Sequence, residues 1–402
     1  MIEASTKEFW RNTLALSIGS LFVFANVYFT QPILPVLSDE FGVSPLTASM
    51  SLSLVILAIG VSLIFYGPAS DSLGRRGVMI VAMGLGALAT ILASFSTTFS
   101  FFLAMRVLQG VFLAGLPSLA LAYIGEEYSQ HALPLAVGVF IGGNTIGGMF
   151  GRVLSGVLTD FQGWHFAFMI MSAISVLCFV LFIFLLRPSQ NFEPKPFRWK
   201  QAMLDYKGHI QNKEMRYAYL IGGLHFLVFV GHFNYMTYRL TDEPFSLPSS
   251  LVGILFLTYI AGTISSQLSG HAAKTYSQSG CIKIGIGIMM TGFLITLIPS
   301  AWTIIIGLLC NCFGFFFAHS TASSWVSGRA TYSKASASGL YLIAYYIGGG
   351  IGPVYLDPFW SWMNWGGVVL GVFLVFVVTG IVAMKMGRLE KRGDGSGASL
   401  GS

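Results

Sequence analysis

Residues 67–76 read GPASDSLGRR, a stretch with one aspartate and two arginines that lies between two long apolar runs. Charged residues make up only 9% of the 402-residue chain, so three charges within ten residues need an explanation. The glycines and the proline of this stretch favour a tight turn. We therefore interpret it as a short loop between two helices that cross a membrane.

The composition excludes a soluble globular protein. Hydrophobic residues make up 54% of the chain, whereas charged residues are far below the roughly one quarter that is typical of soluble domains. The net charge of +6 then reflects basic loops on one side of a membrane and does not indicate a nucleic-acid partner. The four cysteines lack zinc spacing and are expected to be small buried hydrophobes, so we predict neither a metal site nor a cofactor.

Twelve apolar runs are long enough to span a bilayer as α-helices, which takes roughly 20 residues. Apolar residues surround these runs on all sides, as expected for helices embedded in lipid. The predicted fold is therefore an all-α polytopic membrane protein with 12 transmembrane helices. The runs cover residues 13–36, 46–68, 76–97, 100–124, 132–158, 164–187, 216–239, 249–273, 281–299, 302–325, 335–357 and 363–386.

The basic residues predict the orientation, because cytoplasmic loops of membrane proteins are enriched in Lys and Arg. With both termini in the cytoplasm, every basic residue except Arg106, Arg152 and Arg239 lies at or near the cytoplasmic face. The acidic residues of the predicted outer loops are Asp39, Glu40, Asp160, Asp242, Glu243 and Asp357.

The longest connection, residues 188–215, separates six predicted spans from six and is interpreted as a charged cytoplasmic linker. Part of it, around residues 199–206, is expected to form an interfacial helix. The linker divides the chain into an N-terminal bundle, residues 1–187, and a C-terminal bundle, residues 216–387. The remaining residues, 388–402, are predicted to be a flexible cytoplasmic tail.

The two halves repeat each other. SDEFGVSP (38–45) returns as TDEPFSLP (241–248), and GVFLAG (110–115) parallels GFFFAH (314–319). A duplication of six spans is typical of transporters built from two bundles around a central binding site. The chain resembles the major facilitator superfamily over nearly its full length. The resemblance implies a transporter and not an enzyme, with two six-helix bundles related by pseudo-twofold symmetry.

GPASDSLGRR matches the motif G-x-x-x-D-x-x-G-R-R that this superfamily carries between spans 2 and 3. Gly67 and Gly74 would permit the tight reversal of the chain. The resemblance implies that Asp71 docks on the N-terminus of span 11, near residues 333–338, where the helix dipole favours an anion. Such a latch would hold the inner ends of the two bundles together.

The arginines of the motifs have different predicted roles. Arg75 and Arg76 are expected to reach Glu126 and Glu127 at the inner end of span 4, or only to satisfy the positive-inside pattern. Arg106 of RVLQG (106–110) lies inside a span, where a charge costs about 2.5–3.5 kcal/mol on insertion scales. It resembles the span-4 arginine of drug/proton antiporters, which biases the protonation of a nearby acid.

No Asp or Glu lies near the middle of any predicted span, so a proton carrier would be Asp71 or a histidine. His225 and His232 are seven residues apart and therefore lie on one face of span 7, and His319 lies on span 10. Histidine titrates near pH 6.5, which suits proton coupling. The alternative is that these histidines only pack within the bundle.

GGNTIGGMFGR (142–152) resembles the span-5 motif of antiporters, with Gly148 in place of its proline and Arg152 in place of its last glycine. Small residues permit close packing and proline permits bending, so spans 5 and 11 are expected to rock; tight packing without antiport is the alternative. Arg152 is expected to pair with Asp160 in an outer latch or to snorkel. The predicted packing residues are Gly143, Gly147, Gly148, Gly348, Gly352 and Pro353.

The resemblance implies that spans 1, 4, 7 and 10 line the cavity. Amide and aromatic side chains without a fixed negative charge favour neutral, aromatic or weakly anionic solutes. The predicted substrate-binding residues on these spans and on spans 5, 8 and 11 are Asn26, Tyr28, Gln109, Asn144, Asn234, Tyr235, Tyr259, Asn311, Tyr341 and Tyr345.

FNYMTYRL (233–240) and SGLYLIAYYIGGGIG (338–352) resemble the YnfM-like branch of the superfamily, which is grouped with drug-efflux antiporters. The resemblance implies a proton-driven antiporter that exports a small organic compound by rocker-switch alternating access. We expect a monomer in the cytoplasmic (inner) membrane of a bacterium, energised by the proton gradient. The alternative is a proton-coupled symporter that imports a metabolite or nutrient.

Overall fold

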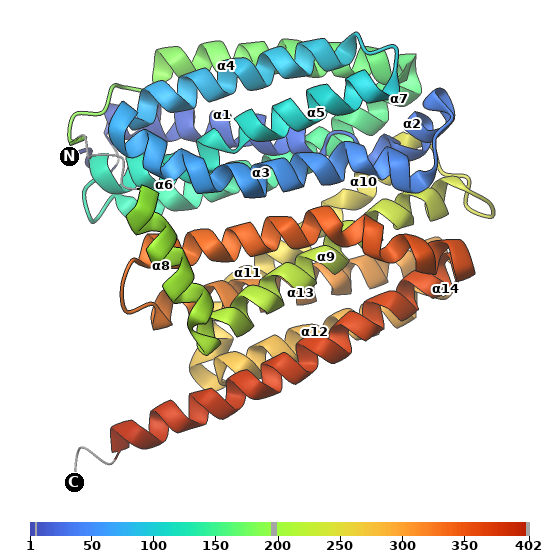
Figure 1. The fold of residues 1–402 in the computed structure, drawn as a ribbon. Coiled ribbons are helices and arrows are strands. Elements are labelled where there is room, and N and C mark those ends of the chain that lie inside the picture. Colours follow the sequence, from blue (N-terminus) through green and yellow to red (C-terminus); the bar gives the residue numbers. More distant parts are fainter. Residues whose placement is uncertain (5, 194–198, 399–402) are drawn as a thin grey trace. The chain divides into compact units, whose positions relative to one another are not determined.

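The computed structural model describes residues 1–4, 6–193 and 199–398, except for the side chains of residues 199, 274 and 392–398 (Figure 1). Within these residues every element is helical apart from one isolated bridge between Ile2 and Tyr128. The all-α class predicted from the sequence is therefore confirmed. Part of the predicted linker, residues 194–198, lies outside the described residues.

The first half of the chain forms helices whose starts follow from the local sequence. The Ser44 hydroxyl accepts a hydrogen bond from the Thr47 backbone N–H at 3.2 Å, and Pro45 occupies the first helical position of α3. The elements are α1 (Lys7–Tyr28), η1 (Gln31–Ile33), α2 (Leu34–Phe41), α3 (Pro45–Leu73), α4 (Arg75–Ser94), α5 (Phe99–Leu113), α6 (Gly115–Glu127) and α7 (Leu133–Leu185).

The second half begins with the linker helix α8, which confirms helical structure in the linker and extends it beyond the expected residues. The last helix also continues into the segment 388–402, which the sequence predicts to be a flexible tail. The elements are α8 (Trp199–Gln211), α9 (Lys213–Thr241), α10 (Ser249–Leu255), η2 (Phe256–Thr258), α11 (Tyr259–Thr275), α12 (Gln278–Thr296), α13 (Ala301–Arg329) and α14 (Lys334–Ala398).

The twelve predicted spans are present. Within the described residues, nine helical segments are long and apolar enough to cross a membrane. Two of these segments each contain two spans. Helix α7 is interrupted by non-helical dihedral angles at Gln162 and Gly163, and α14 is interrupted at Met363 and Asn364. Helix α9, with 29 residues, supplies the remaining span.

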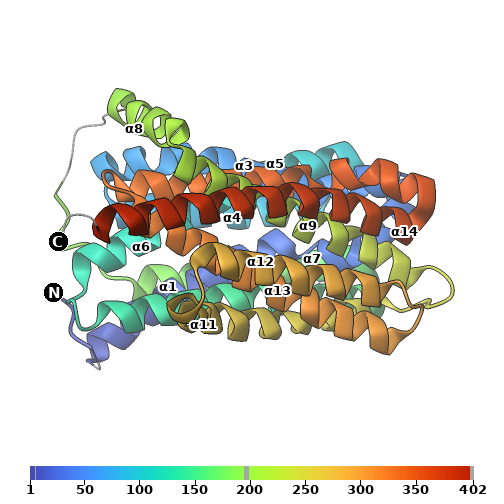
Figure 2. The same ribbon diagram turned by 90° about the horizontal axis from the view of Figure 1, so that it is seen from below.

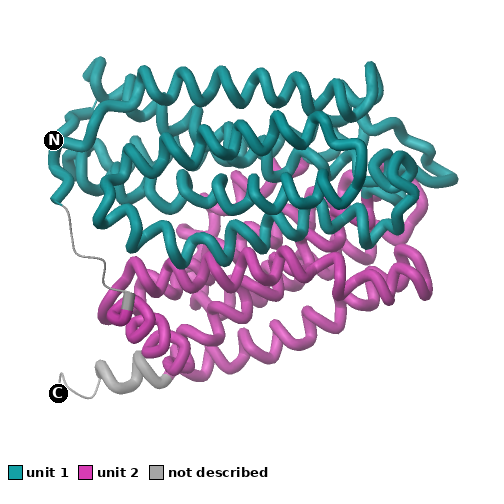
Figure 3. Tube along the Cα trace, turned by 45° about the horizontal axis from the view of Figure 1, so that its top comes forward, with its two compact units in different colours: residues 1–199, 237–256 teal, residues 200–236, 257–402 magenta. Residues whose placement is uncertain are grey.

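The chain forms two compact units: unit 1 contains Met1–Trp199 and Thr237–Phe256, and unit 2 contains Lys200–Met236 and Leu257–Ser402 (Figure 3). Within each unit the long helices lie side by side, as two perpendicular views show (Figure 1, Figure 2). Residues 237–256 belong to unit 1, although the sequence places them in the C-terminal bundle. The reason is that α10 packs closely on α7, described below.

Candidate functional site

The loop between α3 and α4 is held by its own charges. Gly74 has a backbone φ of +90°, a conformation that residues with a Cβ rarely adopt, and it separates the two helices. Asp71 lies 2.6 Å from Arg75, whose guanidinium also lies 2.9 Å from Glu126. The predicted latch residue Asp71 is thus ion-paired within unit 1, with 40% of its side chain exposed.

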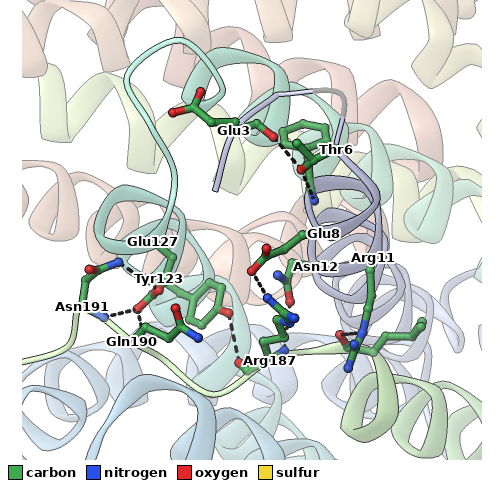
Figure 4. Close-up of polar contacts among 12 residues, drawn as sticks. Glu3, Thr6, Glu8, Arg11, Asn12, Tyr123, Glu127, Arg187, Gln190 and Asn191 are labelled. Carbon is green, nitrogen blue, oxygen red and sulfur yellow. Dashed lines mark hydrogen bonds and ion pairs between the residues drawn. The ribbon is translucent and has the colours of Figure 1, made fainter. Parts of the chain in front are cut away.

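The neighbouring charges fasten the same end of unit 1 to the start of the linker. Arg76 donates to the carbonyl oxygens of Ile183 (3.0 Å) and Leu186 (2.9 Å) at the end of α7. Glu127 accepts the backbone N–H groups of residues 190–191 at 2.8 and 2.9 Å (Figure 4). Arg76 and Glu127 therefore have structural partners other than each other.

Arg106 is fully buried in unit 1 and is bound by oxygen atoms of neighbouring helices. Its guanidinium donates to the carbonyl oxygens of Val27 (2.8 Å), Asn26 (2.9 Å) and Ser51 (3.0 Å), and to the side chain of Gln109. Within the described residues no carboxylate pairs with Arg106. Hydrogen bonds from a charged donor contribute about 1.5–3 kcal/mol each, so these bonds can offset the cost of burying the charge.

Asn26 and Gln109 extend this network through the interior of unit 1. The Gln109 amide donates to Asn26 Oδ1 at 2.9 Å and to the Thr90 hydroxyl at 2.6 Å. The Asn26 amide donates to the Ser175 hydroxyl at 3.0 Å. Both predicted substrate-binding amides are 1% exposed and have partners on four helices, and their contact with a substrate stays a prediction.

Arg152 lies between two aromatic rings, near the end of unit 1 that is opposite to the loop between α3 and α4. Its guanidinium carbon is 3.9 Å from the ring centre of Tyr28 and 4.6 Å from that of Phe256. It donates to Gln31 Oε1 at 2.8 Å and to the Gly148 carbonyl oxygen at 2.9 Å. Because Arg152 is only 1% exposed, it does not snorkel to the membrane surface as one alternative from the sequence held.

Asp160 binds the start of α10. Its carboxylate accepts the backbone N–H groups of Ser249 at 3.1 Å and Ser250 at 2.8 Å. Gly156 permits this approach, because a methyl group there would collide with the carbonyl oxygen of Ser249. Gly253 likewise faces the Arg152 carbonyl oxygen, which would lie 2.7 Å from an added methyl group. These contacts explain why residues 237–256 belong to unit 1.

Tyr238 adds a polar contact to this end of unit 1. Its hydroxyl forms a 3.0 Å hydrogen bond with the Ser38 hydroxyl and donates to the Leu34 carbonyl oxygen at 3.2 Å. Partial burial and the nearby negative charge of Asp39 raise the pKa of the Asp242 carboxyl. Asp39 and Asp242, which correspond to each other in the repeat of the two halves, are thus close enough for their charges to repel.

The small residues of α7 pack against α1 at regular spacing. A methyl group on Gly143 would lie 2.7 Å from the Ser17 carbonyl oxygen, and one on Gly147 would lie 2.6 Å from that of Leu21. The Ser20 hydroxyl of α1 donates a hydrogen bond to the side-chain oxygen of Asn144. Gly67 differs from these, since a side chain there would meet no atom within 4 Å.

The equivalent contact in unit 2 joins α14 to α9. Methyl groups on Gly348 and Gly352 would collide with the backbone of Gly223 and Leu227. The Tyr235 hydroxyl donates to the Pro353 carbonyl oxygen at 3.0 Å, so this predicted substrate-binding side chain also ties α9 to the proline of α14.

Aromatic rings from α9, α13 and α14 form a cluster in unit 2. Phe226 stacks on Tyr345 with ring centres 3.7 Å apart. Phe229 stacks on Phe315 at 3.8 Å, and its ring centre is 5.2 Å from that of Tyr259. The predicted binding residues Tyr259 and Tyr345 therefore lie with these phenylalanines in one group of nearly parallel and edge-on rings, which we call the aromatic cluster.

His319 borders the aromatic cluster. Its Nδ1 atom forms a 2.9 Å hydrogen bond with the Tyr341 hydroxyl, and its ring centre lies 4.7 Å from that of Tyr345. His319 and Tyr345 are both half-buried. A partly accessible histidine, hydrogen-bonded to the buried Tyr341, therefore lies beside the apolar rings of the cluster.

The other polar residues that the sequence predicts for the site in unit 2 are more deeply buried than His319. His225 and His232 are each 1% exposed and face Phe376 and Phe293 of other helices. Among the described residues, both ring nitrogens of His225 and Nε2 of His232 have no hydrogen-bond partner. The Asn311 side chain packs against Gly292 of α12. Asn234 is also fully buried.

Sequence reasoning did not identify several residues of these networks. Thr90 and Ser175 are hydroxyls in apolar spans, a pattern too common to single them out. Tyr238 lies within FNYMTYRL, a stretch that indicates the branch of the superfamily but gives no sign of the contacts of Tyr238. Asp160 is expected from the sequence to pair with Arg152, and no local pattern links it to the start of α10, 89 residues further along the chain.

The helical bundles and the charged loop define a membrane transporter. Residues 16–353 match the model of the Major Facilitator Superfamily, and the chain belongs to this family. The inner membrane transport protein YnfM of Escherichia coli K12 is 37% identical over 96% of this chain and 93% of that protein. The MFS-type transporter YybF of Bacillus subtilis is 35% identical over 98% of each chain. The predicted family and branch are thereby confirmed.

Solved structures support the same fold. A bacterial homologue of the human lysosomal transporter Spinster superposes with a TM-score of 0.75 at 15% identity, covering 94% of this chain and 96% of that one. The nucleoside transporter NupG superposes with a TM-score of 0.73 at 18% identity, covering 93% and 99%. The predicted fold of twelve helices in two bundles is confirmed, and the protein is a secondary transporter of this superfamily.

Proposed function

We propose that the protein exports a small organic compound from the bacterial cytoplasm in exchange for protons. It would act as a monomer in the inner membrane, with both termini in the cytoplasm, by alternating access of the rocker-switch type. The inner-membrane relative YnfM and the basic residues of the predicted inner loops support the location and the orientation.

The observation that carries the proposal is the aromatic cluster beside His319. The ring pairs stacked at 3.7 and 3.8 Å form an apolar group that is half-buried at Tyr345, and the described members of the cluster carry no negative charge. The Tyr341 hydroxyl and His319 add hydrogen-bonding groups at its border. Such a surface favours a planar aromatic compound that is neutral or weakly anionic.

His319 is the proposed proton carrier. It is half-buried, whereas His225 and His232 are each 1% exposed and packed against phenylalanine rings. A carrier must exchange its proton with water, and the partly accessible histidine meets this requirement best. Arg106 is proposed to contribute to coupling only through the network that positions α1 and α5, since it has no acidic partner among the described residues.

The test is uptake of a panel of planar aromatic compounds into everted membrane vesicles with an imposed gradient, acid inside. An antiporter accumulates its substrate in the lumen, and collapse of the gradient abolishes accumulation. Expulsion from the vesicles under the same gradient would instead support the proton-coupled symporter.

The test variant is His319→Gln. Its matched control is His271→Gln, since His271 is an exposed histidine of the same unit. We expect only His319→Gln to uncouple accumulation from the gradient. Accumulation that ignores the gradient in the wild-type protein would contradict proton coupling.

A further inference from the structure

The linker helix α8 is oriented differently from the spans of unit 2. It runs at a steep angle to the long helices of that unit (Figure 1). Only Asn212 separates α8 from α9, and its side chain caps α9 by accepting the Glu214 backbone N–H at 2.9 Å. Because α9 is one of the spans, α8 lies beside the point at which the chain enters the membrane. Its position and its direction are those of a helix that lies along a membrane surface.

One face of α8 is fixed to unit 2. The Asp205 carboxylate accepts a 2.6 Å hydrogen bond from the Ser333 hydroxyl, in the turn before α14. The rings of His209 and Tyr332 are nearly parallel, at 11°, with centres 4.4 Å apart. Gly208 lets the Tyr332 hydroxyl approach, because an added methyl group would collide with it. These contacts determine which side of α8 faces away from unit 2.

The opposite face of α8 carries exposed lysines and exposed apolar side chains. Lys200, Leu204 and Lys207 follow one another at spacings of four and three residues, so they share one side of the helix. Leu204 is 61% exposed and Ile210 is 50% exposed. Lysines beside an exposed leucine and isoleucine are typical of a helix that binds at the boundary between lipid headgroups and acyl chains.

The charges of α8 and the start of α9 are divided between the two faces. The acidic residues bind unit 2, because Asp205 is bonded to Ser333 and the Glu214 carboxylate lies 3.2 Å from Arg329 of α13. The basic residues are exposed, and within the described part of the chain none of them forms an ion pair with a carboxylate. These residues, which we call the basic face, are Lys200, Lys207, Lys213 and Arg216. The segment therefore presents four positive charges that it does not neutralise itself.

We propose that the basic face of α8 and α9 is a binding site for an anionic phospholipid of the cytoplasmic leaflet. The lipid phosphates contact the basic face, and Leu204 and Ile210 reach the upper part of the acyl chains. A cluster of about four to eight Lys and Arg residues beside a span suits the negative surface of such a leaflet. The inference rests on the cytoplasmic location of the linker in the proposed function.

The first test measures the binding of phosphatidylglycerol and phosphatidylcholine to the purified full-length protein by native mass spectrometry. We expect a preference for phosphatidylglycerol. Lys207→Gln should reduce this preference roughly two- to fivefold, because one basic residue near anionic headgroups contributes up to about that factor. Replacing all four residues of the basic face by Gln should remove most of it.

The matched control is Lys283→Gln, since Lys283 is an exposed lysine of α12 outside the basic face, and it should leave the preference in place. An unchanged preference in the fourfold variant, or an equal loss in the control, would overturn the proposal. The basic face would then only follow the positive-inside pattern.

The second test asks whether the exposed face of α8 contacts lipid. An environment-sensitive fluorophore is attached at Leu204→Cys, with the four native cysteines replaced by serine, in full-length protein reconstituted into nanodiscs. Nitroxide-labelled phosphatidylglycerol should quench it more strongly than nitroxide-labelled phosphatidylcholine, and Lys207→Gln should reduce the difference.

Equal quenching by the two lipids would overturn the preference for an anionic headgroup. Quenching by a water-soluble quencher alone would overturn the lipid site altogether. Because neither readout needs a substrate or a gradient, a failure here is distinct from a failure of proton-coupled export.

Discussion

The interiors of the two units are polar in different ways, although their sequences repeat. Unit 1 contains Arg106 and saturates it with oxygen atoms from neighbouring helices. In the repeat that aligns GVFLAG (110–115) with GFFFAH (314–319), Cys310 takes the position of Arg106 and Phe313 that of Gln109.

Unit 2 has aromatic rings and uncharged polar groups instead. Among the described residues, the ring nitrogens of His225 and both polar side-chain atoms of Asn311 lack hydrogen-bond partners. Unit 1 also leaves such atoms, but most are serine and threonine hydroxyls. Unit 1 thus uses its polarity to fix its own helices, while the described part of unit 2 leaves buried imidazole and amide atoms without a hydrogen-bond partner.

The largest effect is expected for Arg106→Leu. The substitution removes the donor shared by three carbonyl oxygens and Gln109, so the free energy of unfolding should fall by about 2–5 kcal/mol and transport should be lost. Thermal unfolding of the purified protein measures the change. An unchanged midpoint would show that the network does not hold unit 1 together. Arg106→Lys should recover part of the loss, because an ammonium cannot replace the planar fork.

Glycine substitutions test the feature that the units share. Gly147→Ala in unit 1 and Gly348→Ala in unit 2 should each lower the free energy of unfolding by about 1–3 kcal/mol through collision with a neighbouring backbone. Gly142→Ala and Gly339→Ala are the matched controls, since an added methyl group meets nothing within 4 Å. Equal unfolding midpoints for a test variant and its control would contradict the close helix contact.

His319→Gln tests the role assigned to unit 2. Gln keeps hydrogen-bonding capacity but does not titrate, so the dependence of transport rate on pH should flatten. Rates in proteoliposomes at several pH values measure this. His232→Gln, at a buried position, should leave the profile in place, and the reverse result would move the proton carrier to α9.

The smallest effect is expected for Tyr341→Phe. It removes the 2.9 Å hydrogen bond to His319 while keeping the ring. The affinity for substrate should therefore fall by roughly two- to tenfold. Equilibrium binding of a transported compound checks the affinity. Tyr217→Phe is a control at a partly exposed tyrosine of the same unit. Equal effects of both variants would remove Tyr341 from the site.

The spans and the charged loop could be predicted because each rests on local information. Hydropathy identifies a helix that crosses a membrane, and the glycines and charges of residues 67–76 mark a turn whatever surrounds it. Such features need no knowledge of the neighbouring helices.

The rotation of each span could not be predicted, because helices that are apolar on all sides give no amphipathic signal. The side chain of Asn311, for example, lies against Gly292 of α12, and its predicted contact with a substrate stays a prediction. The bond between Asp205 and Ser333 joins residues 128 positions apart, and no local pattern announces it. The same holds for Asp160, which binds Ser249 and Ser250.

The kinks of α7 and α14 have a mechanical consequence. Only Gln162 and Gly163 interrupt one helix, and only Met363 and Asn364 interrupt the other. A connection of two residues is too short to let the facing ends of the two spans separate. Neither arm can therefore slide along the other unless the dihedral angles of these two residues change.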